Sequence, residues 1–188
     1  MDFSVSSSSK PTLVIVSGPP GSGKTTLAHA LAVAVPCPAI CRDEIKEGMV
    51  HAEGGELEAA RGDPLTQRTF PLFFDVLRVL LSGGVSVVAE AAFQDQLWRR
   101  GLEPLSELAQ LRVVQLDVDP GVAWERAAQH ARPRAAHAVG PHVEDVESWR
   151  ERHGSFDRVS IPAPSIVVDT TDGYAPGLVE IVEFVKRR

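Results

Sequence analysis

The chain has 188 residues, of which 44% are hydrophobic and 23% charged, and this composition is typical of an ordinary globular domain. Its net charge of −6 at pH 7 gives no general attraction to nucleic acid, and no apolar run approaches the roughly 20 residues that a membrane helix needs. We therefore expect one domain over residues 11–188, with nucleic acid disfavoured as a partner and no membrane contact. Residues 1–10 are rich in serine and predict a flexible tail.

Taken in chain order, short apolar runs alternate with stretches of helical periodicity. Pro71 falls inside one such stretch and predicts a kink or a break between two helices. Residues 51–63 are expected to form a surface excursion and 132–141 a loop. The expected elements are a strand at 12–17, a helix at 26–32, a strand at 39–41, a helix from about residue 43, a helix at 65–81, a strand at 85–89, a helix at 94–108, a strand at 111–118, helices at 121–131 and 143–156, a strand at 165–168 and a helix at 176–186.

This alternation predicts an α/β fold with a five-stranded parallel sheet sandwiched by helices. Parallel sheets bind ligands beyond the carboxyl ends of their strands. That edge should gather five segments: the loop at 18–25, the pair Arg42-Asp43, Glu90, the corner at 117–119 and the turn after Val168.

The loop Gly18-Pro-Pro-Gly-Ser-Gly-Lys-Thr25 fits the phosphate-binding pattern G-x-x-x-x-G-K-[ST], and it lies between an expected strand and an expected helix. Its glycines let backbone N–H groups approach phosphate oxygens, and the following helix presents its positive N-terminus to them. Lys24 is placed to reach the β and γ phosphates, and the Thr25 hydroxyl is placed to ligate Mg²⁺. We therefore expect ATP and Mg²⁺ as cofactors, bound by Gly18, Pro19, Pro20, Gly21, Ser22, Gly23, Lys24, Thr25 and Thr26.

A second constellation, Arg42-Asp43-Glu44-Ile45-Lys46, follows the second strand, across the sheet edge from the phosphate loop. A carboxylate there can accept the proton of a substrate hydroxyl that attacks the γ phosphate. Asp43 is our candidate for this role, and Glu44 is its rival. The alternative is that Asp43 caps the helix that it opens. Arg42 and Lys46 are candidate substrate contacts, although Lys46 could equally be a solvated surface lysine.

The phosphate loop followed by R-D-E-I-K resembles the small P-loop kinases of the adenylate-kinase-like group, which includes polynucleotide-kinase-like and zeta-toxin-like kinases and chloramphenicol phosphotransferase. The resemblance implies that Asp43 is a general base and that Lys46 contacts substrate. It also implies a short lid, at about residues 126–142, whose arginines close over the phosphates. Arginine suits that task because its planar donors match phosphate oxygens. The predicted catalytic set is Lys24, Asp43, Arg126, Arg132 and Arg134.

Three further positions complete the predicted site. Glu90 ends a strongly apolar strand, where an acid supports Mg²⁺ or binds a substrate hydroxyl. Phe93 is a candidate apolar wall for the substrate, although most aromatic residues of this region are expected in the core. Asp119, before Pro120, is expected to cap the next helix. The resemblance places the loop after Val168 on the adenine side.

Cysteine and histidine usage points away from a metal site and towards a cytoplasmic protein. The only cysteines, Cys37 and Cys41, lack the further partners that a zinc site requires, and they are expected to be reduced thiols. Residues 2–9 lack the basic and apolar segments of a signal peptide. No metal-binding spacing is evident among the histidines, which are His29, His51, His130, His137, His142 and His153.

Together these features predict an ATP-dependent kinase that transfers the γ phosphate to a hydroxyl of a small molecule such as an antibiotic, a nucleoside or a sugar derivative. The alternatives are a 5′-hydroxyl polynucleotide kinase and an acceptor-independent ATPase or nucleotide switch. A GTPase switch is disfavoured, because the places of its D-x-x-G and N-K-x-D motifs are occupied by E-A-A-F at 90–93 and D-T-T-D at 169–172.

Overall fold

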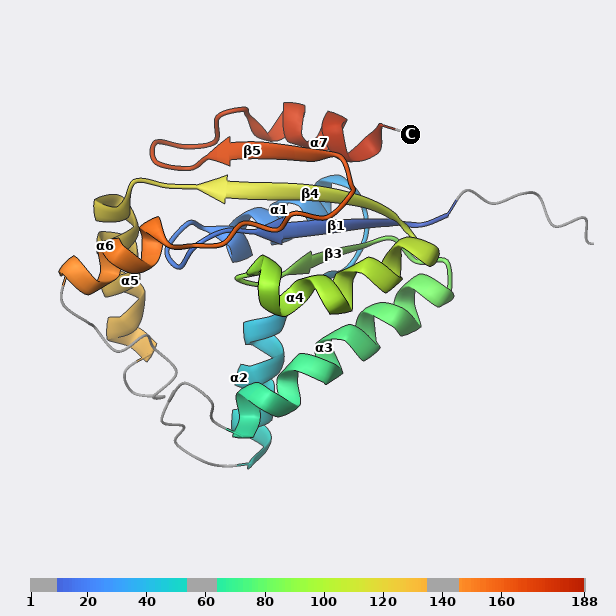
Figure 1. Ribbon diagram of the computed structural model, residues 1–188, viewed down its shortest axis with the longest axis horizontal. Helices are drawn as coiled ribbons and strands as arrows, with labels where there is room; N and C mark the ends of the chain where they lie inside the picture. Colours follow the sequence, from blue (N-terminus) through green and yellow to red (C-terminus); the bar gives the residue numbers. More distant parts are fainter. Residues whose placement is uncertain (1–9, 54–63, 135–145, 188) are drawn as a thin grey trace, which may run out of the picture.

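The computed structural model describes residues 10–53, 64–134 and 146–187. Five parallel strands form one sheet in the order β2-β3-β1-β4-β5, which confirms the predicted α/β fold (Figure 1). The strands are β1 Thr12–Ser17, β2 Ala39–Cys41, β3 Val87–Glu90, β4 Gln110–Asp117 and β5 Ser165–Asp169.

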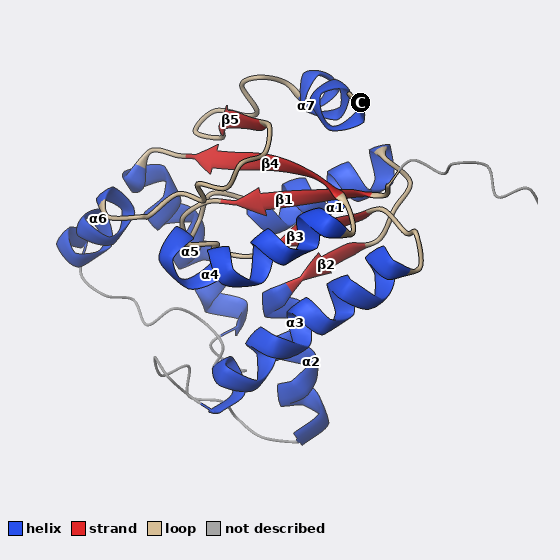
Figure 2. Cartoon of the chain, turned by 45° about the vertical axis from the view of Figure 1, so that its right-hand side comes forward, coloured by secondary structure: helices blue, strands red, loops and turns tan. Residues whose placement is uncertain are grey.

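Helices cover both faces of the sheet (Figure 2). Helices α1 and α7 pack on one face, and α3 and α4 pack on the other. Helices α5 and α6 lie at the end to which the strand arrows point, and α2 extends from the end of β2 (Figure 1). The helices are α1 Lys24–Ala34, α2 Arg42–Glu53, α3 Pro64–Ser82, α4 Asp95–Leu102, α5 Pro120–Arg134, α6 Val146–Gly154 and α7 Leu178–Lys186, with a 3₁₀ turn at Glu103–Glu107.

The alternation of side chains along β1 divides the core into two layers. Leu13 and Ile15 face α3 and α4, whereas Val14 and Val16 face α1 and α7. All four are almost completely buried, because both faces of a parallel sheet are covered by its crossover helices. This packing fixes the carboxyl end of β1, and with it the start of the phosphate loop.

Several element boundaries differ from the sequence expectation for local reasons. Strand β3 begins at Val87 because the N–H of Val85 still donates to Leu80 at the end of α3, through a turn in which Gly84 has φ of 77°. The expected helix at 94–108 ends at Leu102, and Pro104 lies in the 3₁₀ turn. Pro71 causes no break: its side chain is exposed and α3 continues through it.

Helix α5 continues to Arg134, so the expected loop at 132–141 does not begin at residue 132.

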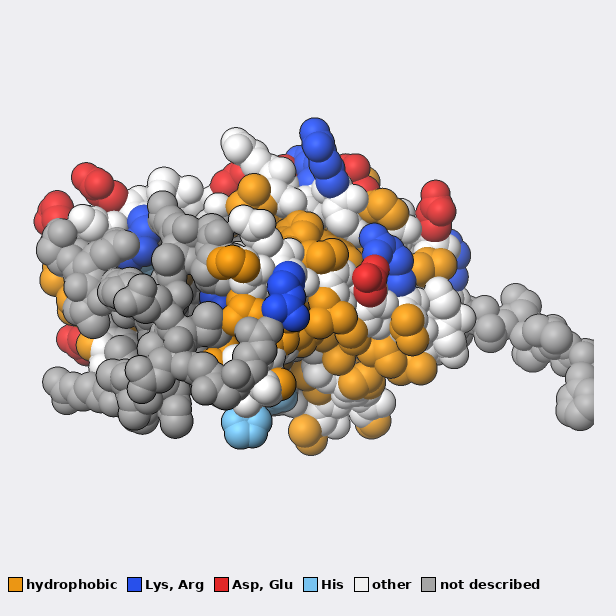
Figure 3. All heavy atoms as spheres, turned by 90° about the horizontal axis from the view of Figure 1, so that it is seen from below, with side chains coloured by type: hydrophobic (Ala, Val, Ile, Leu, Met, Phe, Trp, Pro, Cys, Tyr) orange, Lys and Arg blue, Asp and Glu red, His pale blue; other side chains and the backbone are white. Residues whose placement is uncertain are grey.

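Among the described residues, none of the helices combines the length and the apolar character needed to cross a bilayer. Seen from below, the molecule presents many hydrophobic side chains, with Lys and Arg scattered between them (Figure 3). Leu72 and Val79 of α3 are among the exposed apolar residues.

Candidate active site

The phosphate loop leaves β1 at Ser17 and enters α1 at Lys24. Gly21 and Gly23 have φ of 76° and 78°, a region that disfavours residues with a side chain. A Cβ atom on Gly21 would also overlap the carbonyl oxygen of Ala123, so α5 packs directly against the loop. Both positions therefore favour glycine for backbone conformation, and Gly21 requires it for space as well.

A buried hydrogen bond ties the loop to the far side of the sheet. The Thr170 hydroxyl, just after β5, donates to the carbonyl of Ser22 over 2.9 Å. The Thr170 amide donates to the carbonyl of Asp117 at the end of β4, also over 2.9 Å. The turn after β5, which the resemblance placed on the adenine side, is thus fixed against the phosphate loop.

Lys24, Thr25 and Glu90 form the electrostatic centre of the site. The Lys24 ammonium donates to the carbonyl of Pro19 over 3.0 Å, and the Thr25 hydroxyl donates to the Glu90 carboxylate over 3.2 Å. Glu90 is only 2% exposed, and burial raises its pKa, although the charge of Lys24 opposes that shift. Burial lowers the pKa of Lys24, and the carboxylates of Glu90 and Asp43 oppose that shift.

The donor set at this point suits Mg²⁺. A hydroxyl and a carboxylate are hard oxygen ligands, and Mg²⁺ is typically held by one or two such protein groups together with phosphate oxygens. Thr25 and Glu90 already lie within hydrogen-bond distance of each other. They are the residues that would hold the ion, directly or through water.

Asp43 lies in the first turn of α2, which begins at Arg42, so it is one residue beyond the first helical position and does not occupy the N-cap. Its side chain is 72% exposed and accepts a hydrogen bond from Arg42 Nη1 over 2.9 Å. Its carboxylate is close enough to Lys24 to oppose the lowering of the Lys24 pKa by burial, and close enough to Glu90 to add to the raising of the Glu90 pKa by burial. Asp43 is therefore open to solvent and near the charged residues of the phosphate loop.

Glu44, the rival candidate, points elsewhere. Its carboxylate lies 2.7 Å from Nε2 of His29, one helical turn beyond Thr25 on α1. The Cys41 sulfur lies 3.9 Å from the same nitrogen. The sequence did not reveal this cluster of His29, Cys41 and Glu44, because its members are separated by up to 15 positions and come from different elements.

Arg42 and Lys46 are both anchored in the fold. Lys46 is only 8% exposed, and its ammonium donates to the Thr66 hydroxyl on α3 over 3.0 Å, so it is not a solvated surface lysine. Arg42 is largely covered, and its Nε is buried without a hydrogen-bond partner among the described residues. Lys46 thus connects α2 to α3, whereas Arg42 pairs with Asp43 on its own helix.

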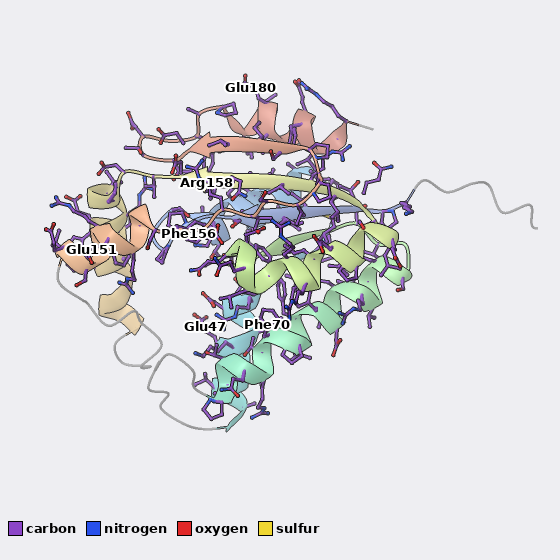
Figure 4. The ribbon with its side chains drawn as sticks, in the orientation of Figure 1. Glu47, Phe70, Glu151, Phe156, Arg158 and Glu180 are labelled. Carbon is purple, nitrogen blue, oxygen red and sulfur yellow. The ribbon has the colours of Figure 1, made fainter. Side chains whose placement is uncertain are left out.

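Phe93 was expected to form part of an apolar wall for the substrate, but it lies in the core. Its side chain is 0% exposed and packs against Trp98, with ring centroids 4.7 Å apart, and against Phe73 at 5.9 Å. Without exposed surface it cannot contact a substrate, and it belongs to the core below α3 and α4. Phe70 is the half-buried member of this aromatic group, and Figure 4 shows it on α3 close to Glu47 of α2.

The lid arginines divide into two groups. Arg126 donates through Nη2 to the carbonyls of Thr170 and Thr171, over 2.8 and 3.2 Å, so it braces the turn after β5. Arg132 and Arg134 lie on the last turn of α5, but their side chains, like residues 135–145, lie outside the described part of the chain. Asp119 caps α5 as expected, accepting from the amides of Gly121 and Val122.

Helix α6 brings residues to the phosphate loop that the sequence reasoning missed. Burial lowers the pKa of His153, which lies close to Pro20 and to the charge of Lys24. His153 stacks on Trp149 with ring centroids 5.0 Å apart, and the guanidinium of Arg152 lies 5.5 Å from the same indole. Trp149 in turn donates to the carbonyl of Pro120 over 3.1 Å. The signal available was the group of basic residues Arg150, Arg152 and His153, which lies a few residues after the predicted lid.

The segment that follows α6 is attached to the carboxyl end of β4. Arg158 forms an ion pair with Asp117 at the end of β4, over 2.7 Å. Figure 4 shows Phe156 and Arg158 on this segment, between α6 and the sheet, while Glu47 and Phe70 lie on the arm formed by α2 and α3. The carboxyl edge of the sheet is thus flanked by two groups of elements, α5 with α6 and α2 with α3.

A phosphate loop between the first strand and helix of a 2-3-1-4-5 parallel sheet defines this chain as a P-loop NTPase. Residues 13–153 match the sequence model of the AAA domain family, and the chain belongs to that family. None of the curated proteins compared with the chain is a significant match.

Solved kinase structures share the fold. A candidate kinase from Chloroflexus aurantiacus J-10-fl is 25% identical, with a TM-score of 0.77 over 94% of this chain and 97% of its own. A gluconokinase from Sinorhizobium meliloti 1021 is 21% identical, with a TM-score of 0.52 over 95% and 91%. The Pnkp1/Rnl/Hen1 RNA repair complex contains a chain that is 18% identical, with a TM-score of 0.57 over 83% of this chain and 50% of that chain. The protein is therefore a member of a kinase-like group of P-loop proteins.

Proposed function

We propose that the protein is an ATP-dependent kinase that transfers the γ phosphate to a hydroxyl group of a small molecule. The observation that carries the proposal is the meeting of Lys24, Glu90 and Asp43 at one edge of the sheet, where the Asp43 carboxylate is close enough to influence the pKa values of Lys24 and Glu90. Lys24 and Glu90 serve the nucleotide, whereas Asp43 is an exposed carboxylate that a donor site alone does not require.

On the donor side, the backbone N–H groups of residues 18–25 and the N-terminus of α1 hold the phosphates. Lys24 offsets charge on the β and γ phosphates as the bond to the leaving oxygen lengthens. Mg²⁺, held by Thr25 and Glu90, supplies further charge compensation when it is bound. Burial keeps the Lys24 ammonium away from bulk water, where its attraction to phosphate would be weaker.

On the acceptor side, Asp43 accepts the proton of the hydroxyl whose oxygen attacks the γ phosphorus. The new oxygen–phosphorus bond forms as the bond to the β-phosphate oxygen breaks, which leaves ADP and a phosphorylated acceptor. Arg42 holds the Asp43 carboxylate over 2.9 Å, so the base has a defined orientation before substrate binds. Because the transition state is loose, positioning contributes more than base strength.

The charges around Asp43 favour a small acceptor over a nucleic acid. Helix α2 carries Glu44 and Glu47 in addition to Asp43, and the described positive charges nearby, Arg42 and Lys46, are largely covered. A polynucleotide would require exposed Lys or Arg along its phosphate track. The likeness to the RNA repair complex concerns the fold, so it does not favour an RNA acceptor.

The proposal is tested by incubating the protein with ATP, Mg²⁺ and a panel of sugars, nucleosides, hydroxyl-bearing antibiotics and a 5′-hydroxyl oligonucleotide. Products are read by mass spectrometry as a gain of one phosphoryl group, and free phosphate is measured in parallel. We expect a phosphorylated small molecule and little free phosphate without acceptor. Phosphorylation of the oligonucleotide alone would support a polynucleotide kinase, and rapid phosphate release that no acceptor changes would support an ATPase.

A further inference from the structure

His29, Cys41 and Glu44 meet at one point beside the active site. They come from α1, from the last residue of β2 and from the first turn of α2. The His29 Nε2 atom lies 2.7 Å from the Glu44 carboxylate and 3.9 Å from the Cys41 sulfur, and all three potential ligand atoms lie within 4.8 Å of one another. An imidazole, a thiol and a carboxylate thus converge although their spacing along the chain matches no metal-binding motif.

We propose that His29, Cys41 and Glu44 form a binding site for Zn²⁺, with water as the fourth ligand. Zinc sites in proteins are built from these three ligand types, and three protein ligands with one open position are a common arrangement. The thiolate distinguishes this site from the neighbouring magnesium site, because sulfur is a poor ligand for hard cations such as Mg²⁺.

The observed distances require small changes to hold zinc. Tetrahedral zinc with typical bond lengths places a sulfur and a nitrogen ligand about 3.6 Å apart, and nitrogen and oxygen ligands about 3.4 Å apart. The sulfur–nitrogen distance of 3.9 Å must therefore shorten slightly, and the nitrogen–oxygen distance of 2.7 Å must lengthen. Cys41 is fixed in the sheet, but the side chains of His29 and Glu44 are 51% and 47% exposed, so both can adjust their rotamers.

The surroundings of the thiol also fit a cation. Cys41 lies opposite Glu90 in the pairing of β2 with β3, and Glu44 approaches from α2. Two acidic groups beside a buried sulfur are unfavourable for a thiolate alone, whereas a bound divalent ion would offset their charge. Zinc would then join α1 to the start of α2.

The test uses the full-length protein without an affinity tag, in the absence of nucleotide. Co²⁺ serves as a spectroscopic substitute for zinc, because a cobalt–thiolate bond gives a charge-transfer band in the near ultraviolet. We expect one equivalent of Co²⁺ to produce this band and one equivalent of Zn²⁺ to abolish it. Zn²⁺ should also raise the midpoint of thermal unfolding, because it binds the folded state alone.

Cys37→Ser is the matched control, since Cys37 precedes β2 at the opposite end of that strand. We expect this variant to keep both the band and the thermal shift, and Cys41→Ser to lose them. His29→Ala should weaken binding by more than about 100-fold, because even loss of a residue that only supports a zinc ligand costs about 10–100-fold.

Three results would each overturn the proposal: absence of the band in the unmodified protein, its loss in Cys37→Ser, or its retention in Cys41→Ser. Thermal unfolding without metal shows whether Cys41→Ser is folded. If it is not, His29→Ala decides, because His29 is exposed and its replacement leaves the core intact. Unchanged cobalt affinity in that variant would contradict the site.

Discussion

At the scale of single residues, the candidate site depends on a few charged groups that the fold holds partly away from water. The Lys24 ammonium lies beside the carbonyl of Pro19 and near two carboxylates, Glu90 and Asp43. Burial and neighbouring charge thus act in opposite directions on its pKa. Its function can be separated from its packing by a substitution that keeps the aliphatic chain.

Lys24→Met removes the charge and preserves most of the side-chain volume. We expect ATP affinity to fall at least about tenfold, since a charge-assisted contact to phosphate contributes about 1.5–3 kcal/mol. Isothermal titration with ATP and Mg²⁺ measures the change. Lys186→Met on the exposed end of α7 is the matched control and should bind ATP as the unmodified protein does. Equal affinity in the two variants would exclude Lys24 as a phosphate ligand.

The Asp95 carboxylate should make the stability of the fold depend on pH. Its carboxylate is 13% exposed and accepts hydrogen bonds from Arg99 Nε over 2.9 Å and from the amide of Ser160 over 2.7 Å. Partial burial acts to raise its pKa, but these donors outweigh it and the pKa is lowered. A carboxylate with a lower pKa in the folded state stabilises the fold above its unfolded pKa, and this contribution disappears as pH falls through the folded value.

Asp95→Asn should therefore destabilise the protein by about 1 kcal/mol near neutral pH, and by progressively less in acid, where both side chains are neutral. Thermal unfolding at neutral pH and near pH 3 measures the two differences. Asp75→Asn, at an exposed pair with Arg78, should change stability little at either pH. If Asp95→Asn lowered the stability equally at both pH values, the ionised Asp95 carboxylate would not be the source of the stabilisation.

At the scale of elements, close packing between helices holds α3, which flanks the site, against α4. Helix α4 approaches α3 so closely that a Cβ atom on Gly101 would overlap the ring of Phe74. Phe74 packs in turn on Phe73 and Trp98, which are buried residues of α3 and α4. Gly101 therefore sets the distance between α4 and α3.

Gly101→Ala and Gly48→Ala form a matched pair of helix substitutions. Gly48, on α2, has no atom within 4 Å of the added Cβ, so alanine there should stabilise by about 0.5–1 kcal/mol through helix propensity. Gly101→Ala should instead destabilise by about 1–3 kcal/mol, because overlap with Phe74 outweighs propensity. Chemical denaturation measures both. Equal stabilisation by the two substitutions would show that α4 can move away without cost.

At the scale of the whole molecule, the sequence was sufficient to predict the α/β fold and the position of the phosphate loop between a strand and a helix, since that loop is a contiguous motif. It was less informative where function depends on contacts between distant segments. Lys46 reaches Thr66 across two helices, and Phe93 lies in the core rather than in a substrate wall. The pairing of Glu44 with His29, which leaves Asp43 as the more exposed of the two carboxylates, depends on tertiary packing that has no local signature.

The most direct measurement is transfer of labelled γ phosphate from ATP to the acceptor panel by the unmodified protein and by Asp43→Asn, with ATP affinity measured alongside. If Asp43 positions the acceptor, the variant should bind ATP normally and transfer phosphate about 100-fold more slowly or worse, the usual cost of losing a positioned proton acceptor. Asp75→Asn should retain full activity. Transfer by Asp43→Asn within about twofold of the unmodified rate, with equal ATP binding, would contradict the assignment of Asp43 as the acceptor-side base.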